Sequence, residues 1–206
     1  MRVSVILGHP RRGSFNHAIA ETAIQTLQAN SHTVRYHDLY AEGFEPAVPA
    51  AEMAKGATLA PTIRQHCDEI AGADGIVVVH PNWWGQPPAI LKGWIDRVLR
   101  VGVAYRFADG DSGEGVPIGL LKARMALVFT TSDTRREREL AVFGDPLETI
   151  WKNCIFGFCG VENFHRKNYG VVVISTPEQR QAWLEDVRQT VGAHFGESQK
   201  AEGRSR

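Results

Sequence analysis

Five short strand-like runs alternate with stretches of helical periodicity along this chain, and that alternation limits the fold more than any other feature. The strand-like runs lie at residues 3–7, 33–38, 75–80, 124–131 and 170–175. The helical patterns lie at residues 15–29, 61–71, 89–99, 147–158 and 178–195. Short apolar strands joined by helices are typical of a parallel sheet covered on both faces. We therefore predict an α/β fold, a three-layer doubly wound sandwich with a five-stranded parallel sheet of order 2-1-3-4-5.

The size and hydrophobic content of the chain bound its organisation. With 206 residues, of which 43% are hydrophobic, it can bury one sizeable core, and we predict a single domain over residues 1–195. Residues 196–206 are polar and are predicted to form a disordered tail. No stretch approaches the roughly 20 apolar residues of a membrane span, so the protein is not expected to be embedded in a membrane.

Charge and cysteine content exclude further classes of function. The 23 lysines and arginines balance 23 aspartates and glutamates, and no basic run occurs, so no nucleic-acid partner is expected. The three cysteines suit unpaired thiols in a reducing compartment, and the expected location is cytoplasmic. His37, His66 and the cysteines show no ligand spacing, which predicts no metal site.

The segment after the third strand-like run is the clearest candidate for a binding site. Pro81, Asn82, Trp83, Trp84 and Gly85 follow this apolar run directly. In an open parallel sheet, ligands bind at the carboxyl ends of the strands, beside the point where the strand order reverses. Adjacent tryptophans are more often packing residues, but their place beside the switch point between the first and third strands favours contact with a large flat ligand.

The loop after the first strand has the features of an anion site. It contains Arg11, Arg12, Gly13 and Ser14 directly before the first helix. The N-terminus of a helix offers unpaired N–H groups and the positive end of the helix dipole, which suit a phosphate. A capped helix with two solvated arginines is the alternative. The loop has neither the Gly-Lys-Ser/Thr ending of a Walker loop nor the G-x-G-x-x-G pattern of a Rossmann dinucleotide site.

The loop after the fourth strand is a third candidate. Thr130, Thr131, Ser132 and Asp133 could bond the polar rim of a flat cofactor through their hydroxyl and N–H groups. Such residues are also ordinary after a strand, where they form turns and caps. Taken alone, this loop is therefore weaker evidence than the tryptophan pair.

Together the three loops resemble one family. The resemblance begins with His9, Arg12, Ser14, Phe15 and Asn16, which have the identities and spacing of that family's first loop. It continues with Pro81-x-x-Trp84, with the string PAILKGW at residues 88–94, and with segments at 103–105 and 127–131. On these residues the chain resembles the flavin-dependent NAD(P)H:quinone oxidoreductases of the DT-diaphorase type, which have a flavodoxin-like fold.

The resemblance implies a cofactor, a reaction and an assembly. The cofactor is a flavin, with FAD favoured and FMN as the alternative, and NAD(P)H is the co-substrate. The reaction is two-electron reduction of a quinone or similar flat acceptor by a ping-pong hydride mechanism. The assembly is a homodimer.

The resemblance also implies the binding residues. Those expected to hold the flavin are His9, Arg12, Ser14, Phe15, Asn16, Pro81, Asn82, Trp83, Trp84, Gly85, Thr130, Thr131, Ser132 and Asp133. Tyr105 and Trp84 are expected to contact the substrate. Backbone N–H groups of Trp84, Gly85 and residues 131–133 are expected to bond the flavin ring.

One departure from the family pattern concerns the proton relay. Family members have a Thr-Thr-Gly-Gly turn followed by a tyrosine and a histidine, whereas this chain has TTSD at residues 130–133 and no Tyr or His before Trp151. The relay cannot be carried over, so no catalytic residue is assigned. Arg135 or Arg136 either stabilises negative charge near the flavin or belongs to a surface charge cluster.

Two other functions stay open. The chain could be a flavodoxin-type electron carrier, although such carriers tend to be acidic and this chain has a net charge of zero. It could instead be a flavin-binding regulatory subunit of a bacterial potassium-efflux system. Rapid oxidation of NAD(P)H by a simple quinone, without a partner protein, would favour the enzyme.

Overall fold

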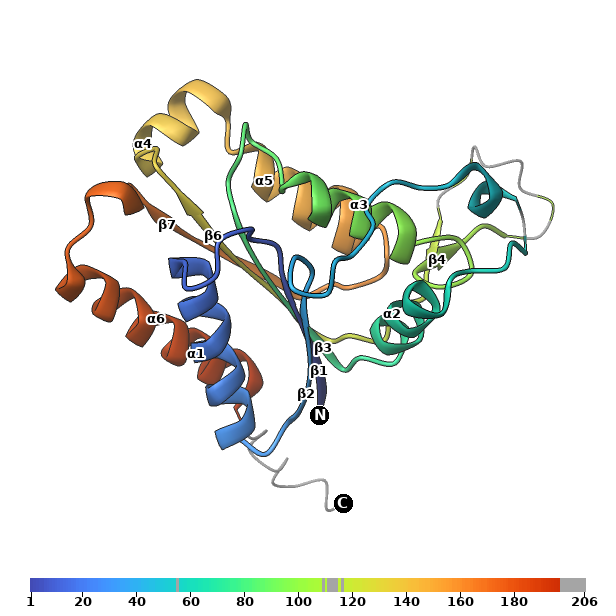
Figure 1. Ribbon diagram of the computed structural model, residues 1–206, viewed down its shortest axis with the longest axis horizontal. Helices are drawn as coiled ribbons and strands as arrows, with labels where there is room; N and C mark the ends of the chain where they lie inside the picture. The colour runs from blue at the N-terminus through green and yellow to red at the C-terminus, as the bar shows by residue number, and fades with distance from the viewer. Residues whose placement is uncertain (55, 109, 111–114, 116, 197–206) are drawn as a thin grey trace, which may run out of the picture.

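A five-stranded parallel sheet forms the centre of the protein. The computed structural model describes residues 1–54, 56–108, 110, 115 and 117–196. In spatial order the strands are β2 (Thr33–Asp38), β1 (Arg2–Leu7), β3 (Gly75–Pro81), β6 (Ala126–Ser132) and β7 (Phe164–Gly170) (Figure 1). This order confirms the predicted 2-1-3-4-5 arrangement. Two short strands, β4 (Tyr105–Arg106) and β5 (Ile118–Gly119), form a separate antiparallel pair.

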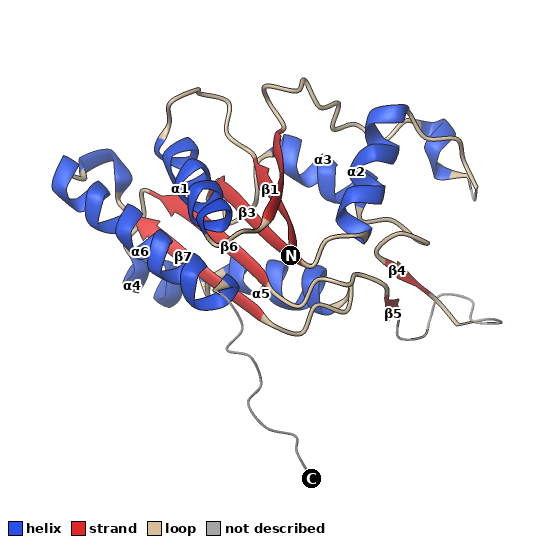
Figure 2. Cartoon of the chain, turned by 90° about the horizontal axis from the view of Figure 1, so that it is seen from below, coloured by secondary structure: helices blue, strands red, loops and turns tan. Residues whose placement is uncertain are grey.

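Helices cover both faces of the sheet, as the three-layer prediction requires (Figure 2). One face carries α1 (Phe15–Ala29) and α6 (Pro177–Phe195). The other face carries α2 (Pro61–Ala71), α3 (Ala89–Val98) and α5 (Pro146–Thr149), which continues as the π-helical segment η3 (Ile150–Gly157). The shorter elements are η1 (Ala50–Met53), α4 (Arg136–Arg138), η2 (Glu139–Phe143) and η4 (Val172–Ile174).

Successive side chains along the strands point to opposite faces of the sheet, which divides the interior into two hydrophobic cores. On β3, Ile76 and Val78 pack on the side of α2 and α3, whereas Val77 and Val79 pack on the side of α1 and α6. A strand points successive side chains to opposite faces, so a strand buried on both sides reads as a continuous apolar run. This is the reason that the apolar run at 75–80 predicted a central strand correctly.

Helix α1 begins where the loop after β1 ends. Ser14 caps it, since its side chain accepts a hydrogen bond from the backbone N–H of His17 at 3.4 Å. Ile19, Ala23 and Leu27 form the buried stripe that holds the helix against the sheet. The N-terminus of α1 therefore lies at the carboxyl edge of the sheet, beside the end of β1.

The predicted position of the fifth strand in the sequence is wrong. Of the predicted residues 170–175 (GVVVIS), only Gly170 belongs to a strand; Val171 has a left-handed φ of 58°, η4 follows, and Val173 and Ile174 are 70% and 73% exposed. The fifth strand is instead Phe164–Gly170, a mostly polar segment. It is an edge strand, and its polar side chains bond to neighbouring elements, so it does not show the apolar run of a central strand.

Gly93 in α3 has a packing role. A Cβ atom at this position would lie 2.3 Å from the Cβ and carbonyl oxygen of Pro46, so only glycine lets the loop before η1 pass against the helix. The conspicuous PAILKGW string thus contributes a helix-to-loop contact of the fold.

Three predictions concern the chain as a whole. Among the described residues, no helix combines the length and apolar character needed to cross a membrane. The predicted tail at 196–206 lies, from residue 197 onward, outside the described residues. The single domain over residues 1–195 stays a prediction.

Candidate functional site

Two neighbouring cavities lie at the carboxyl edge of the sheet. The first, which we call the polar cavity, has a volume of about 520 Å³ and is lined by His9, Arg11, Gly13, Ser14, Phe15, Asn16, Pro81, Asn82, Trp83, Thr131, Ser132, Asp133, Val172, Val173 and Arg180. The second, the apolar cavity, has a volume of about 540 Å³ and is lined by Asn82, Trp84, Gly85, Ser132, Asp133, Thr134, Glu139, Phe143 and Pro146. Three residues, Asn82, Ser132 and Asp133, line both cavities. All three loops singled out in the sequence therefore meet here.

The polar cavity lies at the N-terminus of α1. Gly13 has a left-handed φ of 67°, which lets the chain turn into the helix, and the first turn of α1 carries no acidic residue. Exposed Arg11 and Arg180 line the same cavity from two different segments. Free N–H groups, a helix dipole and two guanidinium groups make this cavity suitable for an anion.

Asn16 supplies a buried acceptor without a partner. It is 3% exposed, and its Nδ2 donates to Thr131 Oγ1 at 2.9 Å. Its Oδ1 is buried and accepts no hydrogen bond within the described part of the chain. Because a buried polar atom without a partner is unfavourable, this oxygen indicates that a hydroxyl or N–H group of a ligand belongs beside it.

His9 faces the polar cavity as a neutral ring. Its Nδ1 accepts the backbone N–H of Arg11 at 3.1 Å. Burial lowers the pKa of His9, and the neighbouring His17 lowers it further. The ring lies 6.5 Å from the ring of Trp83, so the first and second loops contact each other across the cavity.

The tryptophan loop is a tight turn with unusual backbone geometry. Trp83 and Gln86 exchange backbone hydrogen bonds of 3.1 and 3.0 Å around Trp84 and Gly85, whose φ angles are 59° and 71°. Two positive φ angles define a type I′ turn, and an aromatic residue in this region costs about 1–3 kcal/mol. Trp84 is fully exposed at the rim of the apolar cavity.

Gly85 is not available as a backbone donor to a ligand, contrary to expectation. Its N–H donates to Asn82 Oδ1 at 2.9 Å. A Cβ atom at Gly85 would lie 2.7 Å from Pro146 Cγ, so the turn packs closely on the residue that begins α5. The tryptophan loop is thereby fixed from two sides.

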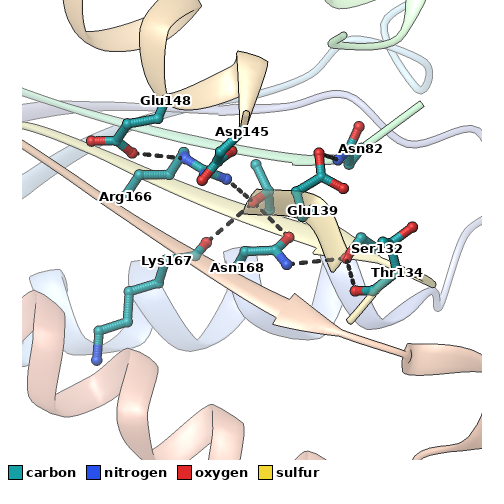
Figure 3. Close-up of polar contacts among 10 residues, drawn as sticks. Asn82, Ser132, Thr134, Glu139, Asp145, Glu148, Arg166, Lys167 and Asn168 are labelled. Carbon is teal, nitrogen blue, oxygen red and sulfur yellow. Dashed lines mark hydrogen bonds and ion pairs between the residues drawn. The ribbon is translucent and has the colours of Figure 1, made fainter. Parts of the chain in front are cut away.

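The loop after β6 lies between the two cavities. Thr130 is fully buried beneath it and lines neither cavity, and Asp133 Oδ1 accepts the N–H of Val173 at 2.9 Å. Ser132 Oγ donates to the carbonyl oxygen of Thr134 and accepts from Asn168 Nδ2 on β7 (Figure 3). Of the predicted residues in this loop, Thr131, Ser132 and Asp133 face the cavities, whereas Thr130 supports them from below.

Glu139 is a site residue that the sequence did not indicate. It is 7% exposed, lines the apolar cavity, and its Oε1 accepts from Asn82 Nδ2 at 3.1 Å (Figure 3). Within the run RREREL, nothing distinguishes this glutamate from its exposed neighbours, because the π-helical turn of η2 sets which side chain faces inward.

Val172, Val173 and Arg180 are further residues that were missed. They reach the polar cavity because η4 turns away from the sheet edge instead of extending β7. Arg180 Nη2 donates to Val172 O at 3.1 Å and its Nε to Ser175 Oγ at 2.8 Å, which ties the first turn of α6 to this segment. Reading residues 170–175 as a strand concealed all three.

Some predicted residues lie outside the cavities. Arg12 is exposed and does not line the polar cavity, whereas its neighbour Arg11 does. Arg135 and Arg136 are exposed at the start of α4 and line neither cavity. Tyr105 packs edge-on against Phe158, with ring centres 4.8 Å apart, in the separate β4–β5 pair.

His37, Glu42 and His66 cluster together, which corrects the expectation that these histidines lie apart. One ligand atom from each lies within 4.8 Å of the others. Trp94 Nε1–H donates to His66 Nδ1 at 3.1 Å, so the proton of a neutral His66 sits on Nε2, 3.3 Å from Glu42. A proton at this atom accounts for the contact between His66 and the carboxylate of Glu42.

The chain is similar to known proteins over most of its length. A family described by its flavodoxin-like fold matches residues 1–193. A protein of Haemophilus influenzae, named as an uncharacterized NAD(P)H oxidoreductase, is 35% identical over 186 residues, which cover 88% of this chain and 89% of that protein. NAD(P)H dehydrogenase (quinone) 1 of Rattus norvegicus is 27% identical over 219 residues, which cover 96% of this chain and 78% of that protein.

A solved structure gives the same picture of the fold. The NAD(P)H:quinone oxidoreductase from Methanothermobacter marburgensis superposes with a TM-score of 0.81 and covers 94% of this chain and 97% of its own. Its sequence is 24% identical, so this likeness bears on the fold alone.

Proposed function

The chain belongs to the family with the flavodoxin-like fold, and from this premise we propose that it is a flavin-dependent NAD(P)H oxidoreductase that reduces quinones or similar flat acceptors. One observation carries the proposal: a polar cavity at a helix N-terminus adjoins an apolar cavity bordered by an exposed tryptophan. A ligand with an anionic tail and a flat ring fits this pair of cavities, and a flavin has both parts.

The polar cavity suits the phosphate-bearing part of the cofactor. The N-terminus of α1 would hold one phosphate, and Arg11 and Arg180 supply guanidinium groups beside it. Asn16 Oδ1 would accept a hydrogen bond from a hydroxyl of the ligand. Two guanidinium groups from separate segments favour FAD, which has two phosphates, over FMN.

The apolar cavity suits the ring and the acceptor. A flavin bound there would supply the hydride chemistry between NAD(P)H and the acceptor. The apolar side chains of Trp84, Phe143 and Pro146 would exclude water from the bound ring and orient flat molecules by contact. Because the apolar cavity adjoins the polar one at these loops, we propose that NAD(P)H and the acceptor use it in turn, which is a ping-pong scheme.

The predicted substrate contact of Tyr105 requires a second copy of the chain. Tyr105 lies in the β4–β5 pair, away from both cavities. We therefore retain the homodimer as a proposal, and sedimentation equilibrium tests it directly.

The function is tested by following the visible spectrum of the purified protein. The protein is loaded with FAD or FMN, desalted, and mixed under argon first with NADPH or NADH and then with menadione. We expect the oxidised flavin band to bleach with the nicotinamide and to recover with the quinone. Flavin released by heating identifies the cofactor.

Two substitutions at opposite ends of α1 make the test specific. Asn16→Ala removes the unpartnered acceptor and should weaken flavin binding about tenfold, as expected for one lost hydrogen bond. Asn30→Ala, at the C-terminal cap, should leave flavin binding unchanged. A protein that retains flavin but is not reduced by nicotinamides would be a carrier or a regulator, and one that retains no flavin would contradict the proposal.

A further inference from the structure

Arg166 on β7 connects two segments that line the apolar cavity and that are far apart in sequence. Its side chain is 4% exposed. The guanidinium contacts Thr130 beneath the loop after β6. It also contacts Asp145 and Glu148 at the start of α5 (Figure 3). A buried guanidinium with three partners is rigid, because its planar fork sets the direction of every bond.

The first connection is a one-way chain of hydrogen bonds. Arg166 Nη1 donates to Thr130 Oγ1 at 3.0 Å, and that hydroxyl donates to Asn168 Oδ1 at 3.0 Å. Asn168 Nδ2 then donates to Ser132 Oγ at 3.0 Å, and Ser132 Oγ donates to the carbonyl of Thr134 at 3.1 Å. Arginine only donates and a carbonyl oxygen only accepts, which fixes the direction of the first and last bonds; the Thr130 hydroxyl also lies 3.3 Å from the carbonyl oxygen of Lys167.

The second connection runs through a strained residue to the tryptophan loop. Arg166 pairs with Asp145 Oδ2 and bonds to Glu148 Oε2 at 3.1 Å. Asp145 has a left-handed φ of 50° and directly precedes Pro146, which lines the apolar cavity. Pro146 packs on Gly85, where a Cβ atom would lie 2.7 Å from the ring of the proline. The ion pair with Arg166 therefore holds the strained turn that seats Pro146.

We propose that Arg166 is a positioning residue that fixes two walls of the apolar cavity, residues 132–134 and the contact of Pro146 with Gly85. Through them it sets the geometry in which a flat ring is bound. The ligand part of this inference rests on the proposed function, whereas the wall part does not. The two parts are therefore tested by separate measurements.

The walls are tested without any ligand by hydrogen–deuterium exchange. Arg166→Lys keeps the charge but cannot reach Thr130, Asp145 and Glu148 at the same time. We expect faster amide exchange in peptides that cover residues 82–86 and 132–146. Unchanged exchange in both segments would overturn the proposal.

Arg97 on α3 provides a matched control, because it lines neither of the two cavities. It is also 4% exposed, and its guanidinium also has several partners, bonding to Glu52 and to the carbonyl of Glu45. Arg97→Lys should destabilise the fold to a similar degree but change exchange near η1 instead of at the cavities. If both lysine variants affect residues 132–146 equally, Arg166 has only a general structural role.

Single-connection variants keep the test decisive if Arg166→Lys fails to fold. Thr130→Val removes the hydroxyl of the first connection and should speed exchange in residues 132–134 only. Asp145→Asn keeps a residue that tolerates positive φ, weakens the second connection, and should speed exchange around residues 144–148. Identical patterns in the two variants would contradict two separate connections.

The ligand part is tested by flavin affinity and steady-state kinetics. With flavin-competent wild-type protein, Arg166→Lys should shift the visible spectrum of the bound flavin and weaken flavin or quinone binding about tenfold, the order expected for lost charge-assisted bonds. Arg97→Lys should do neither. If wild-type protein binds no flavin but the exchange pattern is as expected, the proposed function fails and the positioning role stands. If flavin binds equally to all variants, the ligand part fails.

Discussion

Trp84 is held in a backbone conformation that an aromatic residue rarely adopts, and its side chain gains no burial in return. Its φ is 59° and its side chain is fully exposed. Strain that persists at an exposed residue beside a cavity is consistent with a role in ligand contact. Because the side chain is exposed and the backbone strained, a substitution of Trp84 can change ligand contact without weakening the fold.

Trp84→Asn should therefore raise or preserve stability while it impairs function. Asparagine tolerates positive φ, so we expect the free energy of unfolding to rise by up to about 1 kcal/mol. The KM for a quinone should rise, since the flat contact is lost. Urea unfolding and steady-state kinetics measure the two effects. Trp83→Asn is the control. Trp83 is only 43% exposed, so its loss should destabilise the protein. Equal destabilisation of both variants would contradict the assignment of strain to Trp84.

Gly93 illustrates the opposite case, a residue of the family-like string whose role is packing. Gly93→Ala places a methyl group 2.3 Å from backbone and side-chain atoms of Pro46. We expect destabilisation of about 1–3 kcal/mol, the range for overpacking, in thermal unfolding followed by circular dichroism. Flavin affinity of the folded protein should not change; a selective loss of affinity would show that the string contacts the ligand.

At the scale of elements, His37 joins β2 to α2. Its Nδ1 lies 2.9 Å from Glu42 and its Nε2 lies 2.7 Å from Glu69. Burial lowers the pKa of His37, but hydrogen bonds to Glu42 and Glu69 and their charges outweigh burial, so the pKa is raised. A raised pKa in the folded state stabilises the protein below the unfolded pKa of about 6.5 and loses that contribution as the pH rises through the folded pKa.

The unfolding free energy of wild-type protein should accordingly fall when the pH is raised from about 6 to a value above the raised pKa of His37. His37→Gln should remove most of that slope, as measured by urea unfolding at both values. His165→Gln on β7 is the matched substitution and should leave the slope in place. A slope that persists in His37→Gln would assign the pH dependence to another group.

At the scale of the whole molecule, His80 links the sheet to the helical layer. It lies on the central strand β3 with no exposed surface; its Nε2 accepts from Trp151 at 2.9 Å and its Nδ1 donates to Pro81 O at 2.8 Å. Burial lowers its pKa to about 4. The unfolded chain therefore binds a proton first as the pH falls, and stability should decrease by about 3 kcal/mol between the two pKa values.

Because β3 packs against both cores, this loss should affect the whole fold at once. We expect far-ultraviolet circular dichroism and tryptophan fluorescence to follow one coincident acid transition, as a single domain over residues 1–195 requires. His80→Asn should reduce the slope between about pH 6.5 and about pH 4. Two separated transitions would contradict the single domain.

The sequence by itself determined the strands that are buried on both faces and the loops that follow them. Residues 75–80 and 3–7 are apolar without interruption because both faces are covered, so local pattern is enough. The loops at 9–16 and 81–85 carry their chemistry in consecutive residues, and both line the cavities.

Only the tertiary structure decided the edge strand and the walls of the site. β7 is polar because Arg166, Lys167 and Asn168 find partners on β6, α5 and α6, and partners distant in sequence leave no periodic signal. The apolar pattern predicts that strand at residues 170–175, although Val171 turns the chain out of the sheet. Glu139 and Arg180 likewise reach the site through a π-helical turn and a helix start, whose directions depend on what they pack against.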